Sequence, residues 1–314
     1  MKNILNIIVL LCVIATTSCT LADTYSVGIS NNENNSSISI GLVDLTSGNQ
    51  ALPKLTINGF IYQSSDIQPS TYNYVTKTLT FYGVTVTNKY PYLFVIDCNA
   101  WRVVSQKSVY PYYSYGGLAS TNTVTNNLFT VYYSPDYLHP STVNPSTLSV
   151  YKFDTIYGSY RGSVYLPTIN SYYVAFTNST GLYIRLYDAT TYKFYTEASF
   201  GFANNPYPVN NWPLNLVYNF NSKTVLAQVY MTDSNNRPYY ALAYLDWNNK
   251  VFDVTNMDGY SGDVMLSTVA DSQGQQLIYS FAYSFGQYVL YTYSSYTNSF
   301  LSFRPYLTPI LSTF

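Results

Sequence analysis

The run SYYVAFTN (171–178) and the run LYIRLYDATTYKF (182–194) decide how this chain folds. In both runs apolar residues alternate with polar ones, and this period of two is typical of a β-strand. Val, Ile, Tyr, Phe and Thr are frequent in both, and these residue types favour strands over helices. The second run turns at Asp188, where a short stretch leads into a further strand. The segment therefore predicts consecutive strands joined by tight turns.

The same pattern of an apolar strand, an Asp, a short turn and another strand occurs six times. The segments are 37–49, 92–101, 148–158, 182–194, 240–252 and 288–300, which turn at Asp44, Asp97, Asp154, Asp188, Asp246 and, in the last one, Ser294. The turn positions lie about 50 residues apart on average, close to the ~40–50 residues of a four-stranded propeller blade. The sequence therefore predicts an all-β fold, a six-bladed β-propeller; seven blades of about 42 residues each also fit this repeat.

Shorter apolar runs between the repeats fit the innermost strand of each following blade. These runs are 113–120, 162–169, 213–220 and 263–270. The first repeat begins at Tyr25 with its second strand, so it lacks an innermost strand of its own, whereas residues 305–314 follow the last hairpin and lead into none. We predict that this C-terminal strand pairs with the N-terminal blade and closes the ring, which leaves no exposed sheet edge at the junction.

Two segments carry a resemblance to a known repeat class. VAFTN (174–178) with LYIRLYDATTYKF, and LFVIDCNAWRVV (93–104), resemble YVTN-type propeller repeats, whose pattern runs Tyr-Val-x-Asn, then Val-x-Val-Ile-Asp, then a Thr-Asn turn. Ser294 departs from this pattern because it replaces the Asp. The resemblance extends over most of residues 23–314 and implies a single propeller domain, often found on secreted or cell-surface proteins, without implying one activity.

The N-terminal residues 1–22 have the features of a secretory signal peptide. Lys2 precedes an apolar run at 4–15, and small residues end the segment at Ala22. The run is too short to span ~30 Å of hydrocarbon, so we expect no membrane insertion of the mature chain. Three Asn-x-Ser/Thr sequons fit the secretory route and predict a glycoprotein in the extracellular space; they begin at Asn34, Asn35 and Asn178.

The composition excludes several functional classes. A net charge of −1 gives no electrostatic basis for binding nucleic acid or an anionic membrane. With one His and two Glu, the chain has little material for acid–base catalysis, and we predict no catalytic residues and no cofactor. Recurring Asp residues could suggest a metal ring, but an Asp that opens a type I turn accepts backbone amide hydrogens, and this structural role is favoured; no metal site is predicted.

The long irregular segments all belong to connections that a propeller places on one face. They include 109–115, a predicted loop at 135–147 with Tyr137 and His139, and 198–212. Binding usually occurs on such variable loops over a rigid scaffold. Aromatic rings stack on the C–H faces of sugars, and amides and carboxylates bind their hydroxyls. The predicted ligand-binding residues are Tyr112, Tyr113, Tyr115, Phe202, Trp212 and Tyr260 as stacking rings, with Asn204, Asn205 and Asp258 as polar contacts.

The preferred interpretation is a secreted binding or adhesion module whose partner is a glycan or an extracellular protein. One alternative is an extracellular propeller hydrolase or lyase, for which Asp233, Asp258 and Asp263 are the available acids. Another is a matrix or surface-coat protein that self-associates, because charged residues make up only 9% of the chain and few surface charges oppose association.

Overall fold

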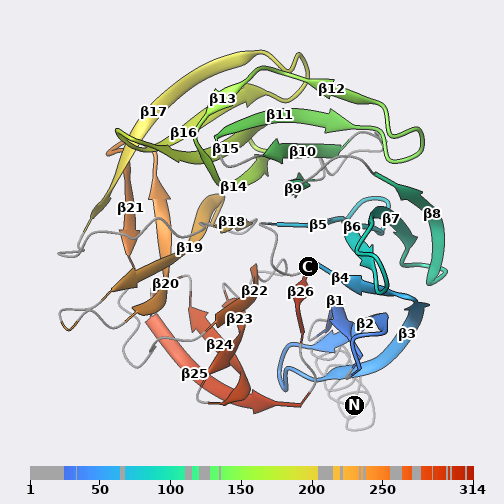
Figure 1. Cartoon of the computed structure of the whole chain (residues 1–314). Coiled ribbons are helices and arrows are strands. Elements are labelled where there is room, and N and C mark those ends of the chain that lie inside the picture. The colour runs from blue at the N-terminus through green and yellow to red at the C-terminus, as the bar shows by residue number, and fades with distance from the viewer. Residues whose placement is uncertain are drawn as a thin grey trace, which may run out of the picture.

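The computed structural model describes residues 25–32, 34–63, 68–109, 115–119, 128–133, 136–203, 215–219, 222–232, 235, 238–254, 264–270, 277–284, 286–294, 296–297, 299–307 and 310–314. All regular elements in these stretches are β-strands. The strands form sheets that are arranged in a ring around a common centre (Figure 1). Residues 1–22, the predicted signal peptide, lie outside the described stretches. Within those stretches no helix is long and apolar enough to cross a membrane.

The described strands form five hydrogen-bonded sheets. The first sheet has the order β26 (Ser312–Thr313), β1 (Tyr25–Asn31), β2 (Ser37–Asp44) and β3 (Gln50–Asn58). In the second, β4 (Phe60–Tyr62) and β5 (Ser70–Asn73) both pair with β6 (Thr78–Thr85), which is followed by β7 (Pro91–Asp97) and β8 (Arg102–Ser108). The third consists of β9 (Tyr115–Ala119), β10 (Leu128–Tyr133) and β11 (Tyr137–Val143), with β12 (Val150–Lys152) and β13 (Ile156–Tyr157) along its outer edge.

The fourth sheet has eight strands and contains two antiparallel units. One unit is β14 (Ser159–Leu166), β15 (Ser171–Asn178), β16 (Gly181–Asp188) and β17 (Phe194–Ala203); the other is β18 (Asn215–Asn219), β19 (Thr224–Thr232), β20 (Pro238–Asp246) and β21 (Val251–Val254). A short parallel pairing of the outer strands β17 and β21 joins them, from Gly201↔Val251 to Ala203↔Asp253. The fifth sheet is β22 (Val264–Ala270), β23 (Leu277–Ser284), β24 (Gln287–Ser294) and β25 (Ser299–Tyr306).

Each meander is buried on both faces because neighbouring sheets stack on it. Along β15, Tyr172 and Val174 belong to a core shared with β10 and β11, whereas Tyr173 and Ala175 belong to a core shared with β18 and β19. The ring of Tyr172 stacks on that of Phe129 in β10, with centroids 4.4 Å apart and planes 14° from parallel. Such pairs add about 1 kcal/mol beyond their buried area. Many of the tyrosines therefore serve as packing residues between sheets.

The C-terminal strand closes the ring, and this prediction is confirmed. β26 pairs antiparallel with β1, where Gly28 faces Thr313 and Ile29 faces Ser312. The Leu311 amide donates to the Ile29 carbonyl at 2.8 Å, and Ile310 is fully buried. The first sheet thus takes its innermost strand from the opposite end of the chain, as the missing strand before Tyr25 predicts.

The predicted innermost strands are also present. β9, β18 and β22 lie within three of the four predicted runs, and β14 overlaps the fourth but begins three residues before it. Together with β5 and β26 they surround the centre of the ring (Figure 1). Neighbouring members contact one another in the order β5, β9, β14, β18, β22 and β26. Ser70 of β5 and Ser312 of β26 complete the circle through a hydroxyl contact of 2.9 Å. The inner strand β5 spans only four residues and does not coincide with any of the predicted runs.

Four of the predicted turn residues cap hairpins. The carboxylates of Asp44, Asp97, Asp188 and Asp246 each accept a backbone amide hydrogen from the residue two positions later, at 2.8–3.0 Å. In the last hairpin the hydroxyl of Ser294 accepts from the Thr297 amide at 3.2 Å. A short polar side chain at this position therefore organises each of these turns, as expected for type I geometry.

The prediction for Asp154 is wrong. The hairpin of the third sheet turns at Asn144, whose side-chain oxygen accepts from the amides of Ser146 and Thr147 at 2.9 and 3.1 Å. Segment 148–158 forms the broken outer edge of the sheet, β12 and β13, and Asp154 lies in the break. The error arose because an amide can replace the carboxylate in this role. With Asn144 as the anchor, the distances to Asp97 and Asp188 become 47 and 44 residues instead of 57 and 34, which makes the repeat more even.

Candidate functional site

Most of the predicted ligand-binding residues lie outside the described part of the chain. These are Tyr112, Tyr113, Asn204, Asn205, Trp212, Asp258 and Tyr260. Tyr115 begins β9, where its backbone pairs with Tyr132. Phe202 lies in β17 and is half-buried, and its ring stacks on Phe252 at 5.4 Å, so one face of this ring is taken up by the core. The loop site stays a prediction.

A cluster of exposed rings lies on the third sheet, in the segment that was predicted as the 135–147 loop. The structure makes 137–143 a strand, β11, and Tyr137 pairs in register with Tyr157 of β13. Their side chains are 44% and 75% exposed. The ring of His139 meets that of Tyr137 edge-on at 5.3 Å, and the exposed Thr155 directly precedes β13, where its hydroxyl contacts Nδ1 of His139. We name Tyr137, His139, Thr155 and Tyr157 the tyrosine platform.

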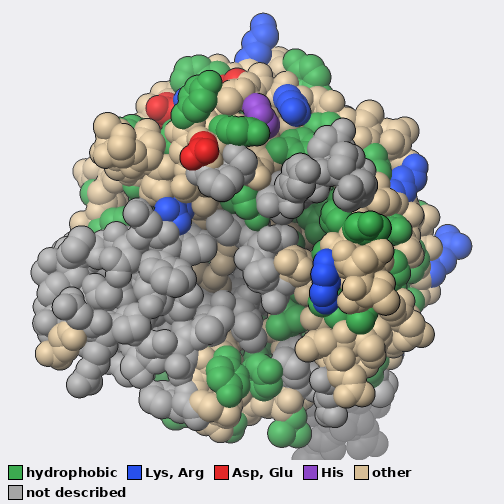
Figure 2. Space-filling model, viewed as in Figure 1, with side chains coloured by type: hydrophobic (Ala, Val, Ile, Leu, Met, Phe, Trp, Pro, Cys, Tyr) green, Lys and Arg blue, Asp and Glu red, His purple; other side chains and the backbone are tan. Residues whose placement is uncertain are grey.

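The platform lies on the face where sequence analysis placed the binding loops. Tyr137 follows the connection between β10 and β11, and Tyr157 is followed by the one-residue link, Gly158, to β14. Both connections belong to the set that joins second to third strands or one sheet to the next. In the space-filling view the single histidine lies on the surface beside a basic side chain, with hydrophobic and acidic side chains nearby (Figure 2).

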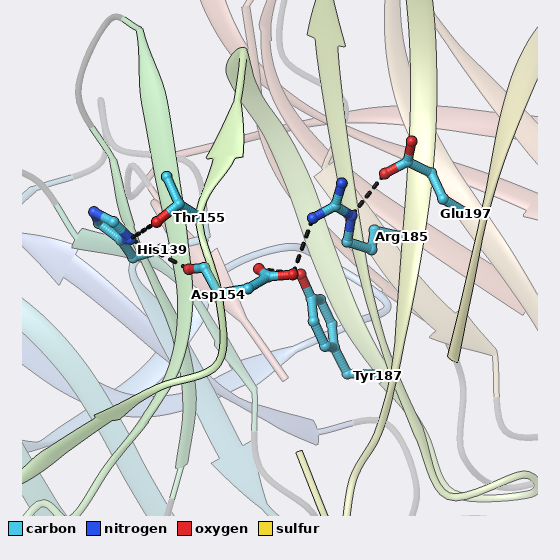
Figure 3. A network of polar contacts seen from close by, with 6 residues as sticks. All are labelled: His139, Asp154, Thr155, Arg185, Tyr187 and Glu197. Atoms are coloured by element: carbon cyan, nitrogen blue, oxygen red, sulfur yellow. Dashed lines mark hydrogen bonds and ion pairs between the residues drawn. The ribbon is translucent and has the colours of Figure 1, made fainter. Parts of the chain in front are cut away.

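The contacts of His139 define its tautomer. Its Nδ1 lies 3.2 Å from the Asp154 carbonyl oxygen and 3.2 Å from the Thr155 hydroxyl (Figure 3). A carbonyl oxygen can only accept, so Nδ1 carries the hydrogen in neutral His139. The other ring nitrogen, Nε2, points away from this network and is left as a hydrogen-bond acceptor. The platform therefore combines two exposed phenol rings with an acceptor nitrogen and a hydroxyl.

Beside the platform, a group of charged residues links the third sheet to the eight-stranded sheet. Nη1 of Arg185 lies 3.0 Å from Oδ2 of Asp154, and its Nε lies 2.6 Å from Oε2 of Glu197. The Tyr187 hydroxyl donates to Oδ1 of Asp154 at 2.7 Å. The guanidinium also lies against the rings of Phe176 and Phe194, at 5.8 and 5.4 Å from their centroids. We name Asp154, Arg185, Tyr187 and Glu197 the Arg185 clasp.

The clasp is suited to holding sheets together rather than to acid–base chemistry. Both of its carboxylates are bound to one guanidinium, which joins the third sheet to the eight-stranded sheet. Burial, and then the hydrogen bond to Asp154, raise the pKa of the Tyr187 hydroxyl, so it remains a donor across the physiological range. The clasp also fixes Asp154, whose carbonyl orients His139. Its effect on the platform is therefore one of positioning.

A second polar cluster lies at the centre of the ring. The Ser163 hydroxyl is within 2.8 Å of the hydroxyls of both Tyr160 and Tyr172 and donates to the Gly117 carbonyl at 3.2 Å. Gly117 has a φ of +62°, and a Cβ there would come within 2.3 Å of the Ser163 hydroxyl, so the cluster requires glycine. Burial raises the pKa of both tyrosines. Neither can therefore act as a base toward Ser163 near neutral pH, and the cluster is structural.

Metal and thiol chemistry have no centre in the described residues. Within them, no group of three or more His, Cys, Asp or Glu side chains converges on a point. Cys98 is buried and not in a disulfide, and burial raises the pKa of its thiol to about 11. At neutral pH it is thus a protonated and unreactive core residue. The acids Asp233, Asp258 and Asp263, which the hydrolase alternative requires, lie outside the described stretches.

Sequence reasoning missed the clasp because its members come from three separate segments: the break between β12 and β13, β16, and β17. One signal points to it. Arg185 stands in the middle of LYIRLYD, between Ile184 and Leu186, which are both buried. A charged residue inside an apolar strand usually has an opposite charge beside it. That signal identifies Arg185, but the partners depend on how the sheets stack.

Comparison with known proteins shows the fold but no family. No family model matches the sequence, and no curated protein matches it. Among solved structures, TolB from Acinetobacter baumannii is similar with a TM-score of 0.59 and 12% identity, over 92% of this chain and 66% of that one. A chain of a nidogen/laminin complex is similar with a TM-score of 0.52 and 11% identity, over 92% of this chain and 97% of that one.

At these identities the similarity concerns the architecture alone. Both neighbours are β-propellers, and each is matched over nearly the whole of this chain. The ring of stacked meanders and the closure by β26 are features of the same architecture. The YVTN-type family is not shown by these matches. The chain described here is a β-propeller.

Proposed function

We propose that this protein is a secreted binding or adhesion module that recognises carbohydrate through aromatic rings on one face of a six-bladed propeller. The eight-stranded sheet counts as two blades, because the parallel contact of β17 with β21 joins two complete four-stranded meanders. The other four sheets count as one blade each. A closed scaffold of this kind holds surface side chains in fixed positions, which lowers the entropy cost of binding.

The tyrosine platform is the observation that supports this function. A sugar ring has an apolar C–H face and an edge of hydroxyl groups. The rings of Tyr137 and Tyr157 are exposed and offer flat surfaces for the apolar face. Nε2 of His139 can accept from a sugar hydroxyl, and the hydroxyl of Thr155 can donate or accept. Exposed rings and polar groups therefore occur together around the paired strands β11 and β13, the combination that carbohydrate recognition uses.

Binding is favoured over the hydrolase alternative for a chemical reason. Glycoside hydrolysis usually needs one protonated and one ionised carboxyl group on either side of the scissile bond. Asp154 and Glu197 are both bound to Arg185, and Asp136, which directly precedes Tyr137, adds one exposed carboxyl group rather than a facing pair. The predicted loop residues, including Tyr112, Tyr113 and Trp212, belong to this proposal as a second set of contacts on the same face.

A glycan array with the full secreted chain tests this function. We expect binding to at least one class of glycan, and a loss of about tenfold in affinity for the double variant Tyr137→Ala/Tyr157→Ala. Tyr296→Ala is the matched control, because Tyr296 is 80% exposed in a hairpin of a different sheet. A chain that binds no glycan, or a double variant that binds like wild type, would overturn the proposal.

Two further measurements separate the contributions. The triple variant Tyr112→Ala/Tyr113→Ala/Trp212→Ala tests the loop residues: weaker binding assigns them to the site, and unchanged binding restricts the site to the platform.

Light scattering at increasing protein concentration tests self-association, which Leu301 and Phe303 on the outer strand β25 favour because they are 51% and 61% exposed. Assembly without glycan binding would favour the surface-coat alternative.

A further inference from the structure

The hairpin between β15 and β16 presents a sequon at the surface of the folded protein. Asn178 ends β15 and Gly181 begins β16, so Ser179 and Thr180 form a two-residue turn. All of Asn178, Ser179 and Thr180 are exposed. The side-chain oxygen of Asn178 accepts from the Thr180 amide at 2.9 Å and from the Thr180 hydroxyl at 2.7 Å. Because the amide oxygen faces the turn, the amide nitrogen Nδ2 faces away from it, toward solvent.

The other two sequons, at Asn34 and Asn35, differ in how the fold uses their hydroxyl residues. The turn at 32–37 is organised by Asn32, whose side-chain oxygen accepts from the amides of Ser36 and Ser37 and whose Nδ2 donates to the Ser36 hydroxyl at 2.9 Å. Ser37 is buried, at 6% exposure. Ser36 belongs to the Asn34 sequon and Ser37 to the Asn35 sequon, but these hydrogen bonds join both serines to Asn32. Thr180, in contrast, binds Asn178, the acceptor of its own sequon.

We propose that Asn178 carries an N-linked glycan and that this glycan borders the tyrosine platform. The inference rests on the proposed secretion, because the reaction needs a lipid diphosphate-linked oligosaccharide and the transferase of the secretory pathway. In the reaction Nδ2 of Asn178 forms a bond to the anomeric carbon of the sugar. The bond from that carbon to the phosphate oxygen breaks, the lipid diphosphate leaves with the electron pair, and Nδ2 loses one proton.

The position next to the platform follows from the chain path. Tyr157 is followed by Gly158, where an added Cβ would lie 2.5 Å from the carbonyl oxygen of Thr177. The residue after Tyr157 therefore packs on the residue before Asn178. Ser159 also pairs in register with Thr177. A glycan on Asn178 starts from the same edge of the protein as the Tyr157 ring.

Peptide mapping of the secreted protein tests the modification. The full chain is expressed in a eukaryotic secretory host behind a well-characterised signal peptide in place of residues 1–22, so that a failure of the native signal does not affect the result. Trypsin cleavage after Arg161 and Arg185 gives peptide 162–185, which contains Asn178 and no other sequon; Asn34 and Asn35 lie in peptide 23–54. We expect a glycan on 162–185 that an amide-cleaving glycosidase removes, leaving Asp. A secreted chain whose 162–185 peptide is unmodified would overturn the proposal.

Three variants around the turn give matched controls. Asn178→Gln removes the acceptor and Thr180→Ala removes the sequon, so both should lose the glycan. Ser179→Ala leaves Asn-Ala-Thr, which is still a sequon, and should keep it. Loss of the glycan from Ser179→Ala, or its presence in Thr180→Ala, would contradict the assignment.

Footprinting with hydroxyl radicals tests the position of the glycan without any ligand, so its result does not depend on carbohydrate binding. We expect slower oxidation of Tyr157 in the glycosylated wild type than in Asn178→Gln. Tyr296, in a different sheet, should react equally in both. Equal oxidation of Tyr157 in both proteins would show that the glycan lies away from the platform. If the glycan array fails while these two experiments succeed, only the proposed function is wrong.

Discussion

The centre of the propeller and its outer rim are both held together by polar side chains, but the two regions use different kinds. At the centre, Ser163, Tyr160 and Tyr172 are neutral and buried, and they bind one another and a backbone carbonyl. At the rim, Arg185 and Glu197 are charged and partly exposed. Burying an ion costs several kcal/mol of desolvation, which pairing repays only when the geometry is good, whereas a buried hydroxyl needs only a hydrogen-bond partner.

The difference explains how a chain with 9% charged residues remains specific in its packing. Neutral hydrogen bonds fix the inner strands where water is excluded. Most charges among the described residues lie where water still solvates them in part, and there they join neighbouring sheets or cap turns. Arg161 of β14 is the exception, because it is buried and its Nε donates to the Thr177 hydroxyl at 2.8 Å. If this division is correct, changes at the closure of the centre should cost more free energy of unfolding than changes at the rim.

Removing residues 310–314 should have the largest effect. The truncation deletes β26, exposes the edge of β1 and removes the fully buried Ile310. Loss of the isoleucine side chain alone costs about 2–5 kcal/mol, so we expect the truncated chain to unfold or aggregate. Thermal melting monitored by circular dichroism is the measurement.

A matched variant separates the loss of the whole strand β26 from the loss of a single hydrogen bond on it. Ser312→Ala keeps β26 and removes only the hydroxyl contact with Ser70, which should cost about 1 kcal/mol. A truncated protein that melts at the wild-type temperature would show that β26 does not close the ring.

Arg185→Gln should have an intermediate effect. The variant leaves Asp154 and Glu197 without the guanidinium that joins them, and their side chains are 33% and 29% exposed. Removing one partner of a fully buried ion pair lowers the free energy of unfolding by about 3–5 kcal/mol. Because both carboxylates are partly solvated, we expect a decrease of about 1–2 kcal/mol for this variant. The measurement is the free energy of unfolding in urea.

Arg102→Gln is the control for charge removal at the rim. Arg102 is 72% exposed and lies 3.7 Å from Asp97, so its loss should cost less than about 0.5 kcal/mol. Equal costs for the two variants would mean that the clasp contributes no more than an ordinary surface pair.

The strands and their closure could be predicted from the sequence because both depend on local patterns. Alternation predicted most of the strands, and the missing strand before Tyr25 indicated where residues 305–314 must go. The hairpin of the third sheet turns at Asn144 and not at Asp154. Asp and Asn cap a turn equally well, so the spacing between anchors identified the correct hairpin better than the residue type did.

The candidate site was harder to predict because it depends on contacts between sheets. Tyr137 and His139 were predicted to lie in a loop, because Pro and polar residues around them interrupt the apolar alternation that indicates a strand such as β11. Tyr157 joins them only through a break in the outer strand, and Asp154 within that break binds Arg185 of the next sheet. No spacing along one strand contains that information.

The hairpin carboxylates should have the smallest effect, and it should appear only in acid. The Thr191 backbone amide and hydroxyl, and then the Thr190 amide, lower the pKa of Asp188 from its ordinary value of 3.8. Because the folded pKa is below the unfolded one, the contribution to stability is complete above the unfolded pKa and is lost as the pH falls through the folded one. Asp188→Asn keeps an acceptor oxygen but cannot titrate. The free energy of unfolding of this variant should therefore fall less steeply than that of wild type between about pH 5 and pH 2. Parallel curves would mean that these hydrogen bonds persist in the unfolded hairpin, and the rim would then contribute through the Arg185 clasp rather than through its turns.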